Sequence, residues 1–122
     1  MLAYVTLGSN NIPKALEFYD AVLAELGANR VFDNDRLYFY AVAPGQPMLA
    51  IGGPYDESAA SCGNGVMPAL AAPDTATVDK VYAKALEMGA ADEGEPGQRM
   101  PTFYGAYFRD PDGNKLCVCK LG

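Results

Sequence analysis

The pattern of hydrophobic and polar residues repeats once along the chain. Residues 2–8 alternate apolar and polar positions, which predicts a strand with one apolar face. From Ile12 to Leu26 apolar residues recur every three or four positions, which predicts an amphipathic helix that stops at Gly27. Residues 66–71 and 75–88 repeat this order of strand and helix.

Further strands and loops are expected after each helix. Extended patterns occur at residues 29–33, 36–42, 48–52 and 90–94. Residues 53–65 are rich in Gly, Ser, Ala and Pro, which predicts a linker or a mobile loop between the halves. Residues 95–102 are also expected to form a loop.

The end of the chain carries a strong β-hairpin signal. An aromatic-rich run at residues 103–109 and an apolar run at residues 115–120 flank the segment Asp110–Asn114. Pro111 presets the φ angle of the second turn position, and Gly113 can adopt the positive φ with which a hairpin closes.

The two halves of the chain follow one plan. Their helices end in the matching segments Leu26-Gly27-Ala28 and Met88-Gly89-Ala90. We therefore expect a single domain of two βαβββ modules, at about residues 1–53 and about 66–122, joined by the linker at about 53–65. Neither module can cover its sheet alone. The expected α+β fold is a curved eight-stranded mixed sheet with the helices outside and a concave face inside.

Composition narrows the possible functions. The chain has 122 residues, a net charge of −6 and no cluster of Lys or Arg, so no nucleic-acid partner is expected. No apolar run approaches the roughly 20 residues of a membrane span, so no membrane partner is expected either. Three cysteines, an odd number without a secretory leader, indicate the reducing cytoplasm. The acidic charge indicates a mild attraction for cationic ligands.

The chain contains no histidine, which removes the commonest metal ligand and the commonest general base at neutral pH. A thiol nucleophile needs a neighbouring base, and Cys117 has no histidine to serve it. Cys117 and Cys119 would have Cα atoms roughly 6.6 Å apart on a strand, near the upper limit for a disulfide. We expect neither a disulfide nor a cofactor.

Four features occur in a fixed order along the chain. They are the two βαβββ modules, the pair Phe18-Tyr19, the segment Gly63-Asn64-Gly65 and the segment Arg109-Asp110-Pro111-Asp112-Gly113-Asn114. Together they resemble the glyoxalase/bleomycin resistance/extradiol dioxygenase family, whose fold is called the vicinal oxygen chelate fold. The resemblance covers essentially the whole chain. It implies a homodimer and a metal site on the concave face, with a His or Glu ligand from each of four strands.

The positions that match those ligands are Tyr4, Ala50, Met67 and Cys117. None of them is a histidine or a carboxylate, whereas Ni, Zn and Fe sites of such enzymes need imidazole and carboxylate donors. Tyr4 is a poor ligand unless it is ionised, and its unperturbed pKa is about 10. The sequence therefore predicts that the standard metal site is missing.

The concave face is expected to offer an organic pocket instead. The predicted ligand-binding residues are Tyr4, Thr6, Tyr38, Tyr40, Ala50, Met67, Arg99, Tyr104, Cys117 and Cys119. They form an apolar, aromatic lining with a few hydroxyl groups, as is usual for small-molecule sites. Tyr38 and Tyr40 are assigned to this face because the alternate residues Leu37 and Phe39 are more typical of a core. Arg99 is either a solvated loop charge or a clamp for a ligand carboxylate or phosphate.

Three functions remain open. The leading hypothesis is a metal-independent, homodimeric protein that binds a small organic molecule in a tyrosine-lined concave pocket. The first alternative is a metal-dependent lyase, similar to lactoylglutathione lyase, or a dioxygenase, with displaced ligands. The second alternative is a non-catalytic structural or interaction subunit, in which Met67, the cysteines and the tyrosines fill a collapsed cavity.

Overall fold

The computed structural model describes residues 1–122 and has two similar halves. Module one contains β1 (Tyr4–Gly8), α1 (Ile12–Ala24), β2 (Asn29–Asp33), β3 (Leu37–Ala41) and β4 (Met48–Gly52). Module two contains β5 (Ala69–Ala71), α2 (Thr75–Glu87), β6 (Ala91–Met100), β7 (Phe103–Arg109) and β8 (Lys115–Leu121). Each half therefore has the predicted order β-α-β-β-β.

The eight strands form two four-stranded sheets, in the orders β1-β4-β3-β2 and β5-β8-β7-β6. In each sheet the first strand of the module pairs in parallel with the last, and the remaining pairs are antiparallel. The α+β class and the two βαβββ modules are confirmed. The strands are divided between two sheets instead of continuing in a single one, and β1 and β5 are each an edge strand.

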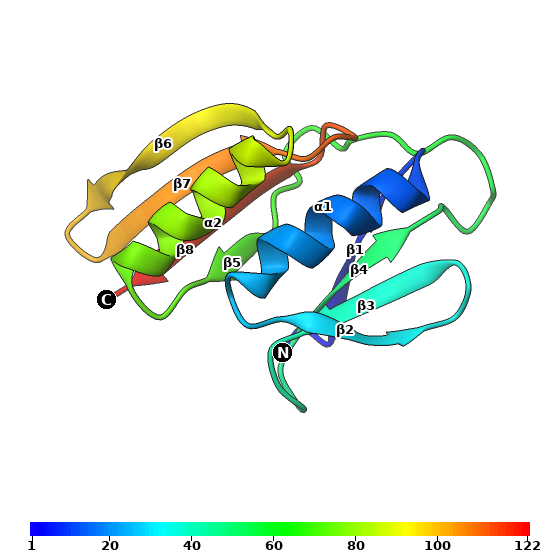
Figure 1. The fold of residues 1–122 in the computed structure, drawn as a ribbon, viewed down its shortest axis with the longest axis horizontal. Coiled ribbons are helices and arrows are strands. Elements are labelled where there is room, and N and C mark those ends of the chain that lie inside the picture. The colour runs from blue at the N-terminus through cyan, green and yellow to red at the C-terminus, as the bar shows by residue number, and fades with distance from the viewer.

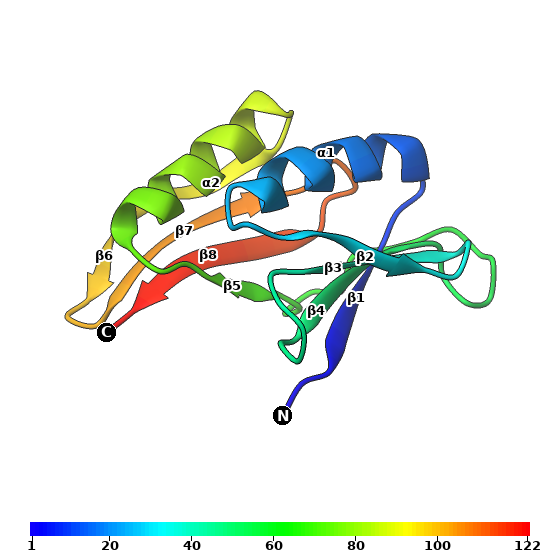
Figure 2. The same cartoon turned by 60° about the horizontal axis from the view of Figure 1, so that its bottom comes forward.

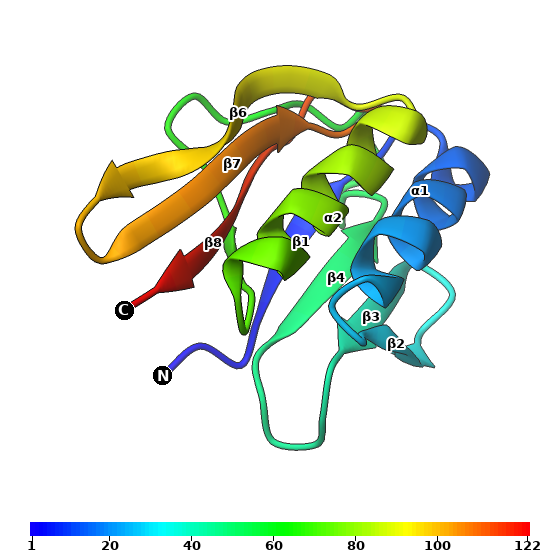
Figure 3. The ribbon, with the colours of Figure 1, turned by 60° about the vertical axis from the view of Figure 1, so that its left-hand side comes forward.

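Both helices lie on the same side of the two sheets, next to each other (Figures 1 and 3). Figure 2 shows this layer of helices above the strands. The main core fills the space between the layers and draws residues from both modules. Its largest fully buried side chains include Phe18, Tyr19, Tyr40 and Phe108. We call the opposite side of the sheets, which faces away from the helices, the concave face.

Both helices start where the sequence predicts, and they end one or two residues earlier than predicted. The side chain of Asn11 accepts a hydrogen bond of 3.2 Å from the backbone N–H of Lys14 at the start of α1. Asp74 accepts one of 2.7 Å from the N–H of Thr77 at the start of α2. Gly27 follows α1 with a φ of 78°, a left-handed conformation that glycine adopts without steric cost. Neither helix is long and apolar enough to cross a membrane.

Two strands, β5 and β6, differ most in length from the prediction. The strand expected at residues 66–71 is reduced to the three residues of β5, because Val66 lies in a turn closed on Gly63 and Pro68 has no N–H for a ladder. The loop expected at residues 95–102 is wrong, since β6 continues to Met100. β6 is an edge strand with several register shifts, and such a strand tolerates Pro96.

The segment between β4 and β5 contains no helix or strand, as predicted for a linker. It is held against the rest of the fold by side chains. Asn10 donates to the backbone oxygen of Ala60 at 3.0 Å and accepts from its N–H at 2.7 Å. The thiol of Cys62 donates to the backbone oxygen of Asp112 at 3.2 Å. The linker therefore lies beside the closing hairpin, at one end of the concave face.

Candidate functional site

Alternation along β7 and β8 decides which side chains reach the concave face. Phe108 and Leu116 are fully buried in the main core. Their neighbours Tyr107 and Cys117 are paired in register between the two strands and point to the opposite side. Cys119 follows two residues after Cys117 on the same face. The concave face of module two is therefore built from an aromatic ring and two thiols.

Two positively charged side chains approach the ring of Tyr107. The guanidinium carbon of Arg99 lies 5.5 Å from the ring centre, and Nζ of Lys115 lies 5.8 Å from it. Cations at such distances are attracted by the π-system of the ring. Neither Arg99 nor Lys115 belongs to any of the ion pairs of the chain. The site thus holds two cations without a carboxylate partner, in a protein whose net charge is −6.

A hollow of about 450 Å³ opens beside Lys115, between the linker and the closing hairpin. It is lined by Cys62, Gly63, Asn64, Gly65, Val66, Met67, Arg109 and Lys115. Arg109 is already engaged, because it donates to the Glu93 carboxylate at 2.7 Å and to the backbone oxygen of Gly113 at 2.9 Å. Lys115 is the unpaired cation of the hollow, whose volume is in the range of small-molecule sites.

The thiol of Cys117 lies at the base of this surface and is fully buried. Burial, with a smaller contribution from the neighbouring thiol of Cys119, raises its pKa to about 12. A thiol with this pKa is protonated at neutral pH, so it is neither a good nucleophile nor a ready metal ligand. It supports the concave face from beneath, because none of its surface is accessible.

Module one contributes an aromatic cluster to the concave face. The ring of Tyr4 meets the ring of Phe39 edge to face, with centres 5.0 Å apart, and Phe32 lies 5.6 Å from Phe39 on the other side. Ala50 is fully buried next to them. Tyr4 and Phe32 remain 47% and 60% exposed, so this cluster offers apolar contact area to a ligand or a partner.

The structure places seven of the predicted site residues on or beside the concave face. These are Tyr4, Thr6, Ala50, Met67, Arg99, Cys117 and Cys119. They fall into two groups, one in each module. Thr6 is paired in register with Ala50 in module one, whereas Met67 lies in the hollow beside Lys115 in module two.

The assignment of Tyr38, Tyr40 and Tyr104 to the concave face is wrong. Tyr40 is buried against α1, where its hydroxyl donates to the Asp20 carboxylate at 2.7 Å, and burial together with this carboxylate raises the pKa of Tyr40. Tyr104 donates in the same way to Asp79 of α2 at 2.7 Å. Tyr38 also packs against the main core.

Tyr40 and Tyr104 face the helices because the polar end of each side chain can be satisfied there. A tyrosine can bury its ring when its hydroxyl finds an acceptor, and the helix carboxylates supply one at the boundary between helices and sheets. Leu37 and Phe39 then face the other way and form the small cluster on the concave face. Lys115 is not among the predicted site residues, although its spacing of two from Cys117 already places both residues on one side of a strand.

The four positions expected to hold a metal do not form a donor set. Ala50 presents a methyl group, and Met67 lies just before β5 with 40% of its surface exposed. Tyr4 has its ring against Phe39, and Cys117 is a protonated thiol at neutral pH. No group of three or more His, Cys, Asp or Glu side chains in the chain could hold an ion. The residues present do not fit the divalent metal that the resemblance implies.

Comparisons with known proteins agree with the fold and its two modules. The model of the glyoxalase/bleomycin resistance protein/dioxygenase superfamily matches residues 1–118. A glyoxalase/bleomycin resistance protein from Albidiferax ferrireducens T118 is 34% identical over 100% of this chain and 99% of its own, with a TM-score of 0.92.

More distant structures share the fold alone. A glyoxalase-related enzyme from Fulvimarina pelagi is 20% identical, with a TM-score of 0.76 over 98% of this chain and 87% of its own. A lactoylglutathione lyase from Agrobacterium tumefaciens is 22% identical, with a TM-score of 0.69 over 98% of this chain and 92% of its own. No curated protein sequence matches the chain.

Proposed function

The chain belongs to the glyoxalase/bleomycin resistance protein/dioxygenase superfamily, and we propose that this member binds a small organic anion on its concave face. One observation carries the proposal: Arg99 and Lys115, which have no carboxylate partner, both approach the ring of Tyr107. Ligand binding here does not depend on the metal site implied by the resemblance, because the donor positions hold Tyr, Ala, Met and Cys.

The charge of the ligand follows from the local charge of the face. The sequence indicates a mild attraction for cations, but that argument uses the net charge of the whole chain. A ligand responds mainly to the charges within a Debye length of about 8 Å, and the two charged side chains that approach the Tyr107 ring, Arg99 and Lys115, are both positive. Guanidinium groups bind carboxylates and phosphates through paired hydrogen bonds, which suits an anionic head group.

The organic part of the ligand is proposed to lie on the apolar surface around the cations. The thiols of Cys117 and Cys119 are buried beneath the face and do not line the hollow, whereas Val66 and Met67 line it next to Lys115. An aromatic or branched aliphatic carboxylate or phosphate would place its charge at Lys115 and its hydrocarbon part against these side chains. The proposed site still binds a small molecule, but it consists of the cations Arg99 and Lys115 and the ring of Tyr107 instead of a pocket lined by tyrosines.

A homodimer is part of the proposal. The exposed rings of Phe32 and Tyr4 in module one form an apolar surface beyond what an isolated ligand would cover. A second copy could cover this surface and enclose the site. Light scattering should then give about twice the chain mass. Three free cysteines support a reducing compartment such as the cytoplasm.

The test compares two probes of similar shape and opposite charge, benzoate and benzamidine, by isothermal titration calorimetry. Benzoate should bind, and Lys115→Gln or Arg99→Gln should weaken its binding by about tenfold each, which corresponds to about 1.4 kcal/mol. The control is Lys14→Gln, which removes an exposed cation of α1 far from Tyr107 and should leave binding unchanged. The proposal would be overturned if benzamidine bound more tightly than benzoate. It would also be overturned if Lys14→Gln weakened benzoate binding as much as Lys115→Gln or Arg99→Gln.

A further inference from the structure

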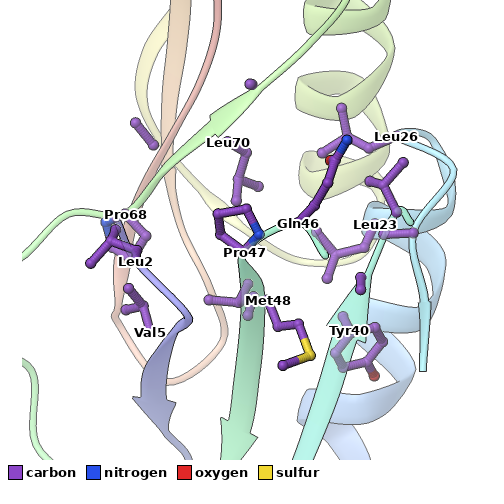
Figure 4. A pocket seen from close by; sticks show the side chains of 16 residues that line it. Leu2, Val5, Leu23, Leu26, Tyr40, Gln46, Pro47, Met48, Pro68 and Leu70 are labelled. Atoms are coloured by element: carbon purple, nitrogen blue, oxygen red, sulfur yellow. The ribbon is translucent and has the colours of Figure 1, made fainter. Parts of the chain in front are cut away.

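A second cavity lies where the two modules meet, and we call it the seam cavity (Figure 4). Its volume is about 280 Å³, and 13 of its 16 lining residues are hydrophobic. None of the residues that approach an anion in the proposed function, Arg99, Tyr107 and Lys115, belongs to its lining. The seam cavity is therefore a separate feature of the fold.

The division of the strands into two sheets explains why this space exists. β1 and β5 are edge strands of different sheets, so no backbone ladder closes the gap between them. Val5 of β1 and Leu70 of β5 line the cavity from the two modules. Leu23 in the last turn of α1 and Leu26, just after the helix, line it from above the sheets. Figure 4 shows these side chains arranged around one common space, with Met48 on the β4 side.

The walls of the seam cavity carry no charged side chain. The hydroxyl of Tyr40 is already used, because it donates to Asp20 at 2.7 Å. Gln46, the one side-chain amide of the lining, is exposed. A charged ligand would lose its hydration here without gaining a partner, which costs several kcal/mol.

We propose that the seam cavity is a binding site for an uncharged, largely apolar molecule of one to three rings. A hydrocarbon-lined cavity of about 150 Å³ accommodates benzene, so a cavity of about 280 Å³ suits a somewhat larger molecule. Leu2 and Val42 lie in the lining with 57% and 54% of their surface exposed, which gives the cavity an apolar entrance. The space is too small for a segment of another protein chain, so the occupant is a small molecule.

Such a ligand would contact both modules at once. It would bind the folded chain and not the unfolded one, so it would raise the stability of the whole domain by mass action. The occupant would also strengthen the contact between β1 and β5, which the backbone leaves unpaired. Binding at the seam cavity should therefore raise the melting temperature of the protein as ligand concentration increases, logarithmically once the concentration exceeds the Kd.

The experiment uses N-phenyl-1-naphthylamine, a neutral aromatic dye whose fluorescence rises in apolar sites, and the full-length chain. One equivalent of dye should bind per chain. Val5→Phe fills the cavity and should weaken dye binding by about tenfold or more. Val31→Phe is the matched control, because Val31 is exposed and does not line the cavity. It should change the affinity less than about twofold.

Two further readouts keep the test independent of how well Val5→Phe folds. Leu26→Trp reduces the cavity from its rim, where Leu26 is partly exposed, and should also weaken the binding of the dye. Methyl NMR of the unmodified protein should show shifts at Leu23, Leu26 and Leu70 when dye is added, and none at Val66. The proposal would be overturned if Val5→Phe and Val31→Phe weakened dye binding equally. It would also be overturned if the NMR shifts were confined to the concave face, or if the dye fluorescence were lost when dilution dissociates a dimer.

Discussion

The hydroxyl of Tyr19 on α1 donates a hydrogen bond of 2.6 Å to the carboxylate of Asp110, which lies 91 residues later in the closing hairpin. Asp110 also accepts from the side chain of Asn114 at 3.0 Å and from the backbone N–H of Asp112 at 2.9 Å. Asn114 in turn donates to the backbone oxygen of Gly8 at 2.9 Å. This buried network connects β1 and α1 of module one to the hairpin of module two.

Removing the Tyr19 hydroxyl should weaken the connection between the modules. Tyr19→Phe leaves the buried Asp110 carboxylate with one donor fewer, and we expect the free energy of unfolding to fall by about 1–3 kcal/mol. Urea unfolding followed by circular dichroism measures this change. Tyr82→Phe is the control, because its hydroxyl donates to the exposed Asp92, and it should cost about 0.5 kcal/mol or less. Equal losses in both variants would contradict the role of the network.

The same tyrosine should make the fold sensitive to alkali. Burial raises the pKa of Tyr19 well above its usual value, and the negative charge of Asp110 raises it further. A group whose pKa is higher in the folded protein than in the unfolded chain stabilises the fold. This contribution is fully present below the unfolded pKa, which is about 10 for tyrosine, and is lost as the pH rises above that value. Urea unfolding between about pH 8 and pH 11 should therefore show falling stability above about pH 10. The fall should be shallower in Tyr19→Phe, and an identical slope would argue against this origin.

The three cysteines should differ in their reactivity. Cys62 is exposed, whereas Cys117 and Cys119 are buried, and burial raises the pKa of Cys117 to about 12. An aromatic disulfide reagent at neutral pH should modify one thiol quickly in the folded protein and all three after denaturation. Cys62→Ser should abolish the fast reaction. A second fast thiol in that variant would mean that the floor of the concave face is open to solvent.

Metal content separates the proposed function from the enzyme alternative. The positions Tyr4, Ala50, Met67 and Cys117 offer no donor set for Ni, Zn, Mn or Fe, so the purified protein should contain far less than one metal ion per chain. Added metal ions should not raise its melting temperature. Elemental mass spectrometry, with a metal-containing relative purified in parallel, measures the content. About one metal ion per chain would favour a lyase or dioxygenase with displaced ligands.

The sequence by itself determines the features that depend on neighbours along the chain. The apolar stripe of each helix, the capping residues Asn11 and Asp74 and the stop at Gly27 act within a few positions, so both helices could be located without the structure. The hairpin around Gly113 follows from turn chemistry in the same way. Repetition of these local signals is sufficient to predict two βαβββ modules.

Only the tertiary structure decides the features that depend on what packs across a sheet. Tyr40 faces the helices because Asp20, on another element, accepts from its hydroxyl, and no pattern within β3 reveals that partner. β6 extends to Met100 because β7 offers it an edge. Arg99 and Lys115 meet at Tyr107 from different strands. Each outcome is set by a contact between segments far apart in sequence, and periodicity carries no information about such contacts.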